Sequence, residues 1–437
     1  MNLKAFFLSR WTILFFISVL ACAIALAYIV PQGFVSSPEE LRTWREGHPL
    51  LGPYVESLGL NNVYSSTWFL LTLSLAIVSL SLPSVRQYEA ARHKTFGAAA
   101  AHAGGGITVD IGLEGMVKAL RGRGYLRIGG EAGGGLRFIK HPWGHWGNFL
   151  LHLGIVVTLA SSMYAALTLK SGMRQYIESM TLMPGAPWLV EDSGLLGGRL
   201  QMPSAVRVES IMPEFWDNGR VRQITTLVSF ITDGEYSRQR RVSVNSMQTY
   251  NGMRIYQTLD FGDAFHLVFT DAQGNKNEMA TLVPHPQGLR KEGYGDFQPP
   301  HFPYLVRVKY LTDAAGKELW GNDPLVTVRL MEKDRNAGQA TLRKGEVRQV
   351  GEYKVTLEQT GKWTGLVFVH MGGMPGLFTG FFVMVIGAAF NYFTPPREVT
   401  AIQSGEGYEL SWRAVKFAAF YQDEYERLFR EIGRGSA

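Results

Sequence analysis

The sequence has almost no cysteine, since Cys22 is the only one among 437 residues. A single thiol cannot form an intrachain disulfide or a thiol-exchange pair. Because Cys22 lies inside a long apolar run, we interpret it as a small hydrophobic side chain. The sequence therefore excludes a disulfide-stapled fold and a thiol–disulfide oxidoreductase built from this chain alone.

Nucleotide-binding signatures are also missing. The glycine clusters at 104–106 and 129–135 lack the Lys-Ser/Thr of a phosphate loop and do not open a helix after a strand. We expect the second cluster to be a flexible hairpin turn between two short apolar runs. The net charge of +6 comes without a nucleic-acid-binding signature, so no nucleic acid is expected as a partner.

Charged residues are nearly absent from four stretches in which hydrophobic residues gather. A hydrocarbon core about 30 Å thick requires roughly 20 apolar residues per helix. The qualifying runs are 11–30, 64–82, 146–169 and 376–394. The first run exceeds the roughly 7–15 residues of a signal-peptide core, so we expect a retained helix. The sequence predicts an integral membrane protein with four transmembrane helices.

The distribution of Lys and Arg near the helix ends indicates the orientation. Lys4 and Arg10 precede the first span, a basic run lies between the second and third, and Arg397 follows the fourth. We therefore expect a multi-pass membrane protein with both termini in the cytoplasm. Contact with anionic membrane lipid accounts for most of the excess positive charge.

The predicted class is an α+β membrane protein, with four transmembrane helices and a large β-rich, antiparallel sandwich-like extracytoplasmic domain. Short β-branched runs between turn residues indicate that domain. We expect a hairpin turn at 271–275, a long loop at 284–303 and an amphipathic surface helix over 410–432, lying on the bilayer or on the cytoplasmic loop. The expected parts are helices 1 and 2 with a short outer loop (1–83), a basic cytoplasmic loop (84–145), helix 3 (146–169), the extracytoplasmic domain (170–375), helix 4 (376–394) and a cytoplasmic amphipathic tail (395–437).

His152 is the one side chain within the four runs that titrates near neutral pH. A polar side chain at membrane depth costs free energy, and imidazole is a standard ligand of haem iron. Two interpretations stay open, a metal or haem ligand and a histidine that hydrogen-bonds a neighbouring helix. His145 lies about 10 Å earlier on the same face, too far to grip the same iron from the opposite side. A partner subunit or another helix would have to supply the second axial ligand.

Three other histidines flank the apolar runs. His141 and His145 lie beside Trp143 and Trp146 at the entrance to the third span, where such residues are typical of a membrane interface. His370, just before the fourth span, is a candidate contact for a molecule passed outward. The remaining histidines show no metal-ligand spacing.

Several segments, taken in order, resemble the ResB family, also called CcsB. These segments are Val30–Gln32, Val63–Phe69, Gly144–Gly154, Val242–Asn245, Tyr250–Thr258 and Phe393–Arg397. The likeness extends over nearly the whole chain and includes the four-helix topology. No single segment is decisive, but their order is specific.

The resemblance implies a subunit of the system II cytochrome c synthetase, located in the bacterial cytoplasmic (inner) membrane. Members act with a CcsA-type partner to carry haem b, bound transiently, across the membrane and present it for attachment to Cys-x-x-Cys-His apocytochromes. It implies that His152 is an axial ligand of the haem iron. His145 and His370 are weaker candidates for haem contacts, from their positions at the ends of the spans and not from the resemblance. No catalytic residue is implied, because such a chain is at most one half of a haem–apocytochrome lyase. The alternative is a non-catalytic scaffold whose outer domain docks apocytochrome c or the CcsA-type partner.

One departure from the family pattern precedes the fourth span. Family members usually have Asp-Pro-Gly there, and this chain has Met374-Pro375-Gly376. The proline and glycine predict that the turn into the helix is kept. The role of the carboxylate is in doubt for this chain.

Overall fold

The computed structural model describes residues 3–33, 36, 38–97, 106–128, 135–333, 335–405 and 407–434. The chain divides into two compact units. One, the helical unit, comprises residues 1–166 and 372–437, and the other, the β domain, comprises residues 167–371. Each unit is described by itself.

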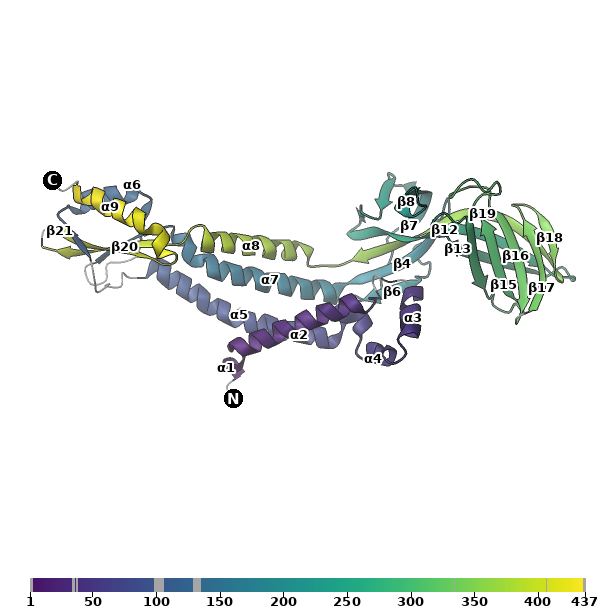
Figure 1. Cartoon of the computed structure of the whole chain (residues 1–437), viewed down its shortest axis with the longest axis horizontal. Coiled ribbons are helices and arrows are strands. Elements are labelled where there is room, and N and C mark those ends of the chain that lie inside the picture. Colours follow the sequence, from purple (N-terminus) through teal and green to yellow (C-terminus); the bar gives the residue numbers. More distant parts are fainter. Residues whose placement is uncertain are drawn as a thin grey trace. The chain divides into compact units, whose positions relative to one another are not determined.

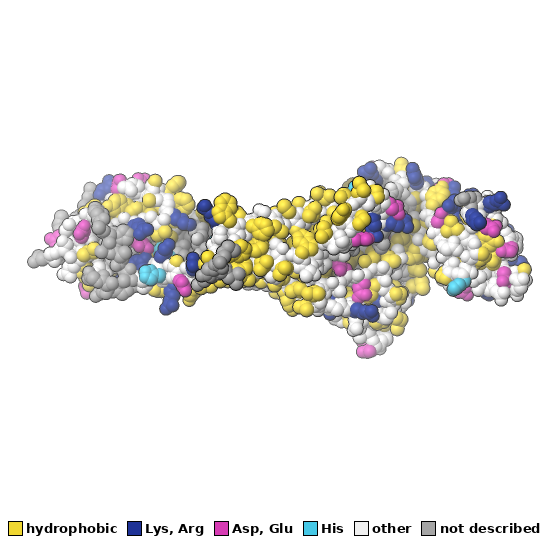
Figure 2. Space-filling view, turned by 90° about the horizontal axis from the view of Figure 1, so that it is seen from below, with side chains coloured by type: hydrophobic (Ala, Val, Ile, Leu, Met, Phe, Trp, Pro, Cys, Tyr) yellow, Lys and Arg dark blue, Asp and Glu magenta, His cyan; other side chains and the backbone are white. Residues whose placement is uncertain are grey.

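Four helices of the chain are long and apolar enough to cross a membrane, which confirms the predicted spans. They are α2 (Arg10–Ile29), α5 (Thr67–Phe96), α7 (Gly147–Thr168), which follows the 3₁₀ turn η2 (Pro142–Trp146), and α8 (Met374–Tyr392). Hydrophobic side chains dominate the surface over these helices (Figure 2). The shorter helices of the unit's N-terminal part are α1 (Leu3–Phe7), α3 (Pro38–Gly47), α4 (Gly52–Ser57) and η1 (Leu60–Ser65).

Helix α5 continues to Phe96, well past the predicted end at residue 82. Pro83 lies inside it, as membrane helices tolerate, and helix-forming residues follow. The helix ends where Arg137 donates hydrogen bonds to the carbonyls of Lys94 and Gly97, the latter at 3.1 Å. A cation at this position satisfies carbonyls that the helix itself leaves unpaired.

The basic loop and the C-terminal tail fold together into one small domain, defined as residues 106–140 and 397–434. Its antiparallel sheet has the order β1-β21-β20-β3-β2, and α6 and α9 lie over the sheet (Figure 1). The elements are β1 (Ile107–Val109), α6 (Leu113–Gly122), β2 (Tyr125–Arg127), β3 (Gly135–Lys140), β20 (Arg397–Ser404), β21 (Gly407–Ala414), η3 (Ala418–Tyr421) and α9 (Gln422–Arg434). Met116 and Leu120 of α6 share a buried core with Leu428 and Ile432 of α9.

The prediction of one helix over 410–432 is wrong in its first half, because β21 ends only at Ala414. Leu410 is buried between strands β1 and β20. The two-residue alternation of side chains in a strand, and not a helical spacing, therefore describes this segment. The second half is helical, and α9 packs on the former loop, as one of the two alternatives predicted. Strands β2 and β3 pair as the predicted hairpin, whose glycine turn at 129–134 lies outside the described residues.

The β domain confirms the predicted β-rich, antiparallel region. Its strands are β4 (Lys170–Ile177), β5 (Thr181–Leu182), β6 (Val190–Ser193), β7 (Ala205–Phe215), β8 (Val221–Thr232), β9 (Glu235–Tyr236), β10 (Arg240–Ser243), β11 (Gln248–Tyr250), β12 (Met253–Thr270), β13 (Lys276–Pro284), β14 (Glu292–Phe297), β15 (Leu305–Leu311), β16 (Leu325–Glu332), β17 (Arg335–Leu342), β18 (Val347–Val350) and β19 (Tyr353–His370). The long strands β12 and β19 pair along most of their length. One stretch of them packs on β15 and β16, and another packs on β7 and β8, which gives two apolar cores.

The prediction of a long loop over 284–303 is wrong, since β14 lies within it and pairs with β15. Its glycines let aromatic rings lie directly on the strand. A Cβ at Gly293 would lie 2.1 Å from Cε1 of Tyr310. The hairpin turn at 271–275 is confirmed, because the Asp271 carboxylate accepts hydrogen bonds from the backbone N–H groups of Gln273 and Asn275.

Candidate functional site

Helix α7 packs against α8 through glycines, so the two backbones approach very closely. A Cβ at Gly154 would lie 2.6 Å from the backbone nitrogen of Met384 and 2.7 Å from the carbonyl oxygen of Gly380. A Cβ at Gly387 would lie 2.4 Å from the nitrogen of Leu151. Small residues at such positions are how membrane helices gain van der Waals contact without a hydrophobic driving force. This interface fixes the helix that carries His152.

His152 lies on a different side of α7 from these glycines. At about 100° per residue, it falls roughly 160° from Gly154 and on the same side as Phe149 and Met163. The Phe149 ring contacts Tyr88 of α5, and the Met163 sulfur accepts a hydrogen bond from Ser74 of α5. The His152 side chain is partly exposed, so it is not locked into the α7–α8 interface.

The His152 ring has one nitrogen engaged and one available. Nδ1 lies 3.0 Å from the carbonyl oxygen of Asn148, one turn earlier on α7. A carbonyl oxygen can only accept, so Nδ1 carries the proton and Nε2 carries the lone pair. Within the described part of the chain, Nε2 has no hydrogen-bond partner. A histidine whose Nδ1–H is held by a backbone carbonyl has the tautomer that metal-ligating histidines use.

His145 has a different environment. Its Nε2 lies 3.3 Å from the carboxylate of Glu398, which also pairs with Arg137 at 2.7 Å. Burial alone would raise the pKa of Glu398, but its contacts with His145 and Arg137 hold that pKa below its ordinary value. The three side chains join η2, β3 and β20, so His145 fastens the small domain to the start of α7. The structure does not bring His145 and His152 together.

His370 is the last residue of β19 and is exposed. It pairs in register with Lys170, and its ring lies beside Gly252. Three residues later, Gly373 adopts a left-handed φ of 79° and α8 begins at Met374, with Pro375 in the first turn. The predicted turn into the fourth span is therefore kept without the family's carboxylate. No group of three or more His, Cys, Asp or Glu side chains in the described ranges could hold a metal ion.

Sequence reasoning missed a polar network at the small-domain end of α7 and α8. Lys416 donates to Oδ1 of Asn391 on α8, and Nδ2 of Asn391 lies 3.5 Å from Oδ1 of Asn148. Asn148 is the residue whose carbonyl holds His152. Asparagines inside apolar runs were the signal that could have found this network, because buried amides need partners.

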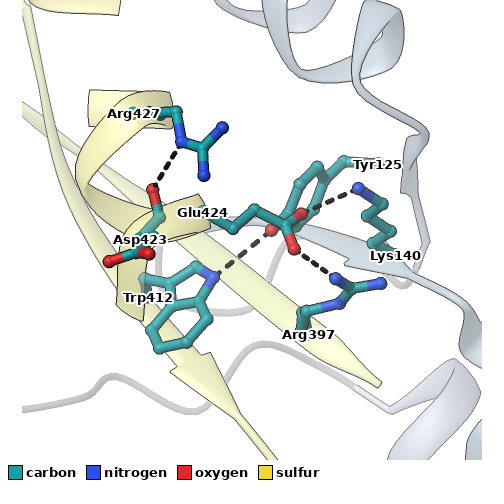
Figure 3. A network of polar contacts seen from close by, with 7 residues as sticks. All are labelled: Tyr125, Lys140, Arg397, Trp412, Asp423, Glu424 and Arg427. Atoms are coloured by element: carbon teal, nitrogen blue, oxygen red, sulfur yellow. Dashed lines mark hydrogen bonds and ion pairs between the residues drawn. The ribbon is translucent and has the colours of Figure 1, made fainter. Parts of the chain in front are cut away.

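A second polar network joins α9 to the sheet of the small domain (Figure 3). Glu424 pairs with Lys140 of β3 at 2.7 Å and with Arg397, the first residue of β20. Beside it, Nε1 of Trp412 donates to the Tyr125 hydroxyl at 3.3 Å, and burial raises the pKa of Tyr125 to about 12. These contacts fix the small domain, and the two cations Lys140 and Arg397 share the single carboxylate of Glu424.

Comparison with known proteins gives relatives for nearly the whole chain. A model described as the ResB-like family matches residues 12–342. A cytochrome c biogenesis protein CcsB of Synechococcus sp. (strain JA-3-3Ab) is 23% identical, over 93% of this chain and 86% of that protein. The protein of the same name from Trichormus variabilis (strain ATCC 29413 / PCC 7937) is 24% identical, over 94% of this chain and 88% of that protein. The solved structure of a cytochrome c haem lyase CcmF covers 80% of this chain and 44% of its own, at 10% identity and a TM-score of 0.25, too low to define a shared fold.

Proposed function

The chain belongs to the ResB-like family, and from this premise we propose that it is one subunit of a system II cytochrome c synthetase. It acts with a CcsA-type partner, carries haem across the bacterial inner membrane and presents it to Cys-x-x-Cys-His apocytochromes. The small domain faces the cytoplasm and the β domain faces outward. The names of the relatives and the four membrane helices support a role in cytochrome c biogenesis.

The observation that carries this proposal is the state of His152. Its Nδ1–H donates to the Asn148 carbonyl, and its Nε2, which has no partner among the described residues, lies on a side of α7 that Gly154 does not occupy. This residue ligates the iron of the haem substrate on one face. Because the described membrane helices contain no second histidine at comparable depth, the partner supplies the other axial ligand.

The test is the haem content of the complex purified with its partner. His152→Ala is expected to lower the Soret absorbance per protein at least about tenfold, because the loss of a mere hydrogen-bond partner of a metal ligand typically costs roughly 10–100-fold in affinity and the loss of the ligand itself costs at least as much. His48→Ala is the matched control, since His48 stacks on Trp44 of the exposed helix α3 and should leave the spectrum unchanged. An unchanged Soret band in His152→Ala would contradict the ligand assignment.

The alternative scaffold role gives the opposite pattern in cells. It predicts that His152→Ala matures c-type cytochromes normally, whereas deletion of residues 200–370 does not. Normal maturation with His152→Ala would favour the scaffold.

A further inference from the structure

Lys416 is a cation at the small-domain end of the helices, and among the described residues it has no carboxylate partner. Three neighbouring cations each contact a carboxylate, Arg137 that of Glu398 and both Lys140 and Arg397 that of Glu424. Lys416 makes no ion pair within the described residues. Its ammonium is held instead by the Asn391 amide oxygen and lies 6.0 Å from the centroid of the Tyr392 ring. A partly buried charge kept without a counterion is open to an anionic ligand.

The position of this charge is tied to His152 through a short chain of contacts. Asn391 connects Lys416 to the side chain of Asn148, whose carbonyl accepts from His152. Asn148 precedes His152 by four residues, so the amide pair lies about 6 Å along α7 toward the small domain. Measured along the axis of α7, the ammonium is therefore offset from His152 by roughly one helical turn or more, which is of the order of the separation between the iron and the carboxylates of a haem.

We propose that Lys416 binds a propionate of the haem whose iron His152 ligates, an inference that rests on the proposed function. Haem is an apolar disc with two carboxylates on one edge. Those carboxylates are costly to keep in hydrocarbon, whereas an ammonium at the helix ends offers a charge-assisted hydrogen bond. The contact orients the propionate edge toward the small domain. It also makes the site select a dicarboxylate porphyrin over one that lacks charge.

The test compares haemin with haemin dimethyl ester, in which both carboxylates are blocked. Binding is measured by the Soret change of the purified complex, stripped of haem, in a neutral detergent. The wild type is expected to prefer haemin by about tenfold, the size of one charge-assisted hydrogen bond. In Lys416→Gln that preference should fall close to unity, and Lys416→Arg should restore most of it. Lys118→Gln makes the same charge change on the exposed side of α6 and should keep the preference.

The outcomes separate this inference from the proposed function. A Lys416→Gln complex that still prefers haemin tenfold overturns the propionate contact, while the loss of Soret absorbance in His152→Ala still supports the function. Equal weakening of both porphyrins would mean a structural role for Lys416 and would also overturn it. If added phosphatidylglycerol abolishes the preference, the ammonium serves lipid headgroups and the inference fails. A Soret band unchanged in His152→Ala refutes the function itself.

An independent observation concerns two adjacent leucines of the β domain. Leu195 and Leu196 are 74% and 69% exposed. Their loop is fastened to the last turn of α7 and the residue after it, because Leu196 N–H donates to the Leu167 carbonyl at 2.8 Å and Gly194 N–H donates to the Leu169 carbonyl at 2.9 Å. A Cβ at Gly197 would lie 2.1 Å from the carbonyl oxygen of Leu169. The loop therefore approaches the backbone after α7 more closely than any residue but glycine permits.

The attachment sets the depth of the loop. Since α7 is a membrane-spanning helix that ends at Thr168, a loop hydrogen-bonded to Leu167 lies where the chain leaves the hydrocarbon. We infer that Leu195 and Leu196 insert into the lipid leaflet on that side and hold the base of the β domain against the bilayer. The occupant is lipid because two exposed leucines are held by hydrogen bonds at the end of a helix that is apolar enough to span a membrane.

The lone native cysteine makes this inference simple to test. In a Cys22→Ser background reconstituted in vesicles, an environment-sensitive fluorophore is attached to Leu195→Cys or to Leu289→Cys, a leucine of the same domain that is 64% exposed. Compared with the label at 289, the label at 195 should emit at shorter wavelength. It should also be quenched several-fold more by lipids with a spin label on the acyl chain. Equal quenching at both sites would overturn the inference, as would a label at 195 shielded from both lipid and aqueous quenchers.

Discussion

Gly154→Leu is expected to separate α7 from α8 and to leave little folded protein. Its side chain would begin 2.6 Å from the Met384 backbone nitrogen and 2.7 Å from the Gly380 carbonyl, and neither atom can move without displacing the helix. Overpacking a tight interface typically costs about 1–3 kcal/mol, and here the clash is with backbone, so we expect at least the upper part of that range. The measurement is the midpoint of thermal unfolding in detergent, together with the yield of monodisperse protein.

Gly122→Leu is the matched control for that result. Gly122 ends α6 of the small domain, and no atom lies within 4 Å of a Cβ built there. This variant should unfold within a few degrees of the wild type. If Gly154→Leu were as stable as Gly122→Leu, the close contact between α7 and α8 would be refuted.

The stability of the β domain is expected to fall steeply between pH 6.5 and pH 4 because of His285. Burial, followed by the nearby charge of Lys362, lowers the pKa of His285 from 6.5 to about 4. The ring stacks on Phe261 with centroids 4.8 Å apart, and neither of its nitrogens has a hydrogen-bond partner in the described chain. The nearby Lys362 is itself paired with the buried Asp263 at 2.7 Å.

The sign follows from which state binds the proton. In the unfolded chain His285 protonates as the pH falls through 6.5, whereas in the folded domain it stays neutral until about pH 4. As the pH falls, the unfolded state therefore binds the proton first. The free energy of unfolding drops by about 3 kcal/mol as the pH falls from 6.5 to about 4. Stability above pH 6.5 is unaffected by this group.

His285→Phe should remove that pH dependence. A phenyl ring suits the aromatic surroundings of Phe215, Phe261 and Trp320, and it carries no nitrogens that need partners. Urea unfolding followed by tryptophan fluorescence at pH 7, 5.5 and 4 measures the effect for both proteins. Carboxylates such as Asp263 titrate in both, so the difference between the two curves isolates His285. If the free energy of unfolding depended on pH in the same way in both proteins, His285 would not be held neutral in the folded domain.

The sequence predicted best what depends on local apolar length. The four spans followed from runs of about 20 apolar residues, and His152 followed from being the lone imidazole within them. Its partner, the Asn148 carbonyl, is also local, one turn away. The tautomer could not be predicted, because it depends on the ring orientation.

Long-range pairing was beyond such patterns. The small domain joins segments from either side of the β domain, as in the pair of Lys140 and Glu424, 284 residues apart. The pattern predicts helix over 410–414, where the structure has the second half of β21, because the buried Leu410 also fits a helical spacing and only pairing with the neighbouring strands distinguishes the two. The role of Lys416 was not predictable for the same reason. It depends on the hydrogen bond to Asn391 of α8 and on Glu424, which pairs with Lys140 and Arg397 but not with Lys416.

The central claim is that Nε2 of His152 ligates haem iron, and chemical rescue tests it most directly. His152→Gly removes the imidazole and leaves a space for one, so added imidazole can bind the iron without being part of the chain. We predict that the purified complex of His152→Gly lacks the wild-type low-spin Soret band and regains it on titration with imidazole, whereas the wild-type spectrum does not change. A wild-type Soret band in His152→Gly before imidazole is added would contradict the account.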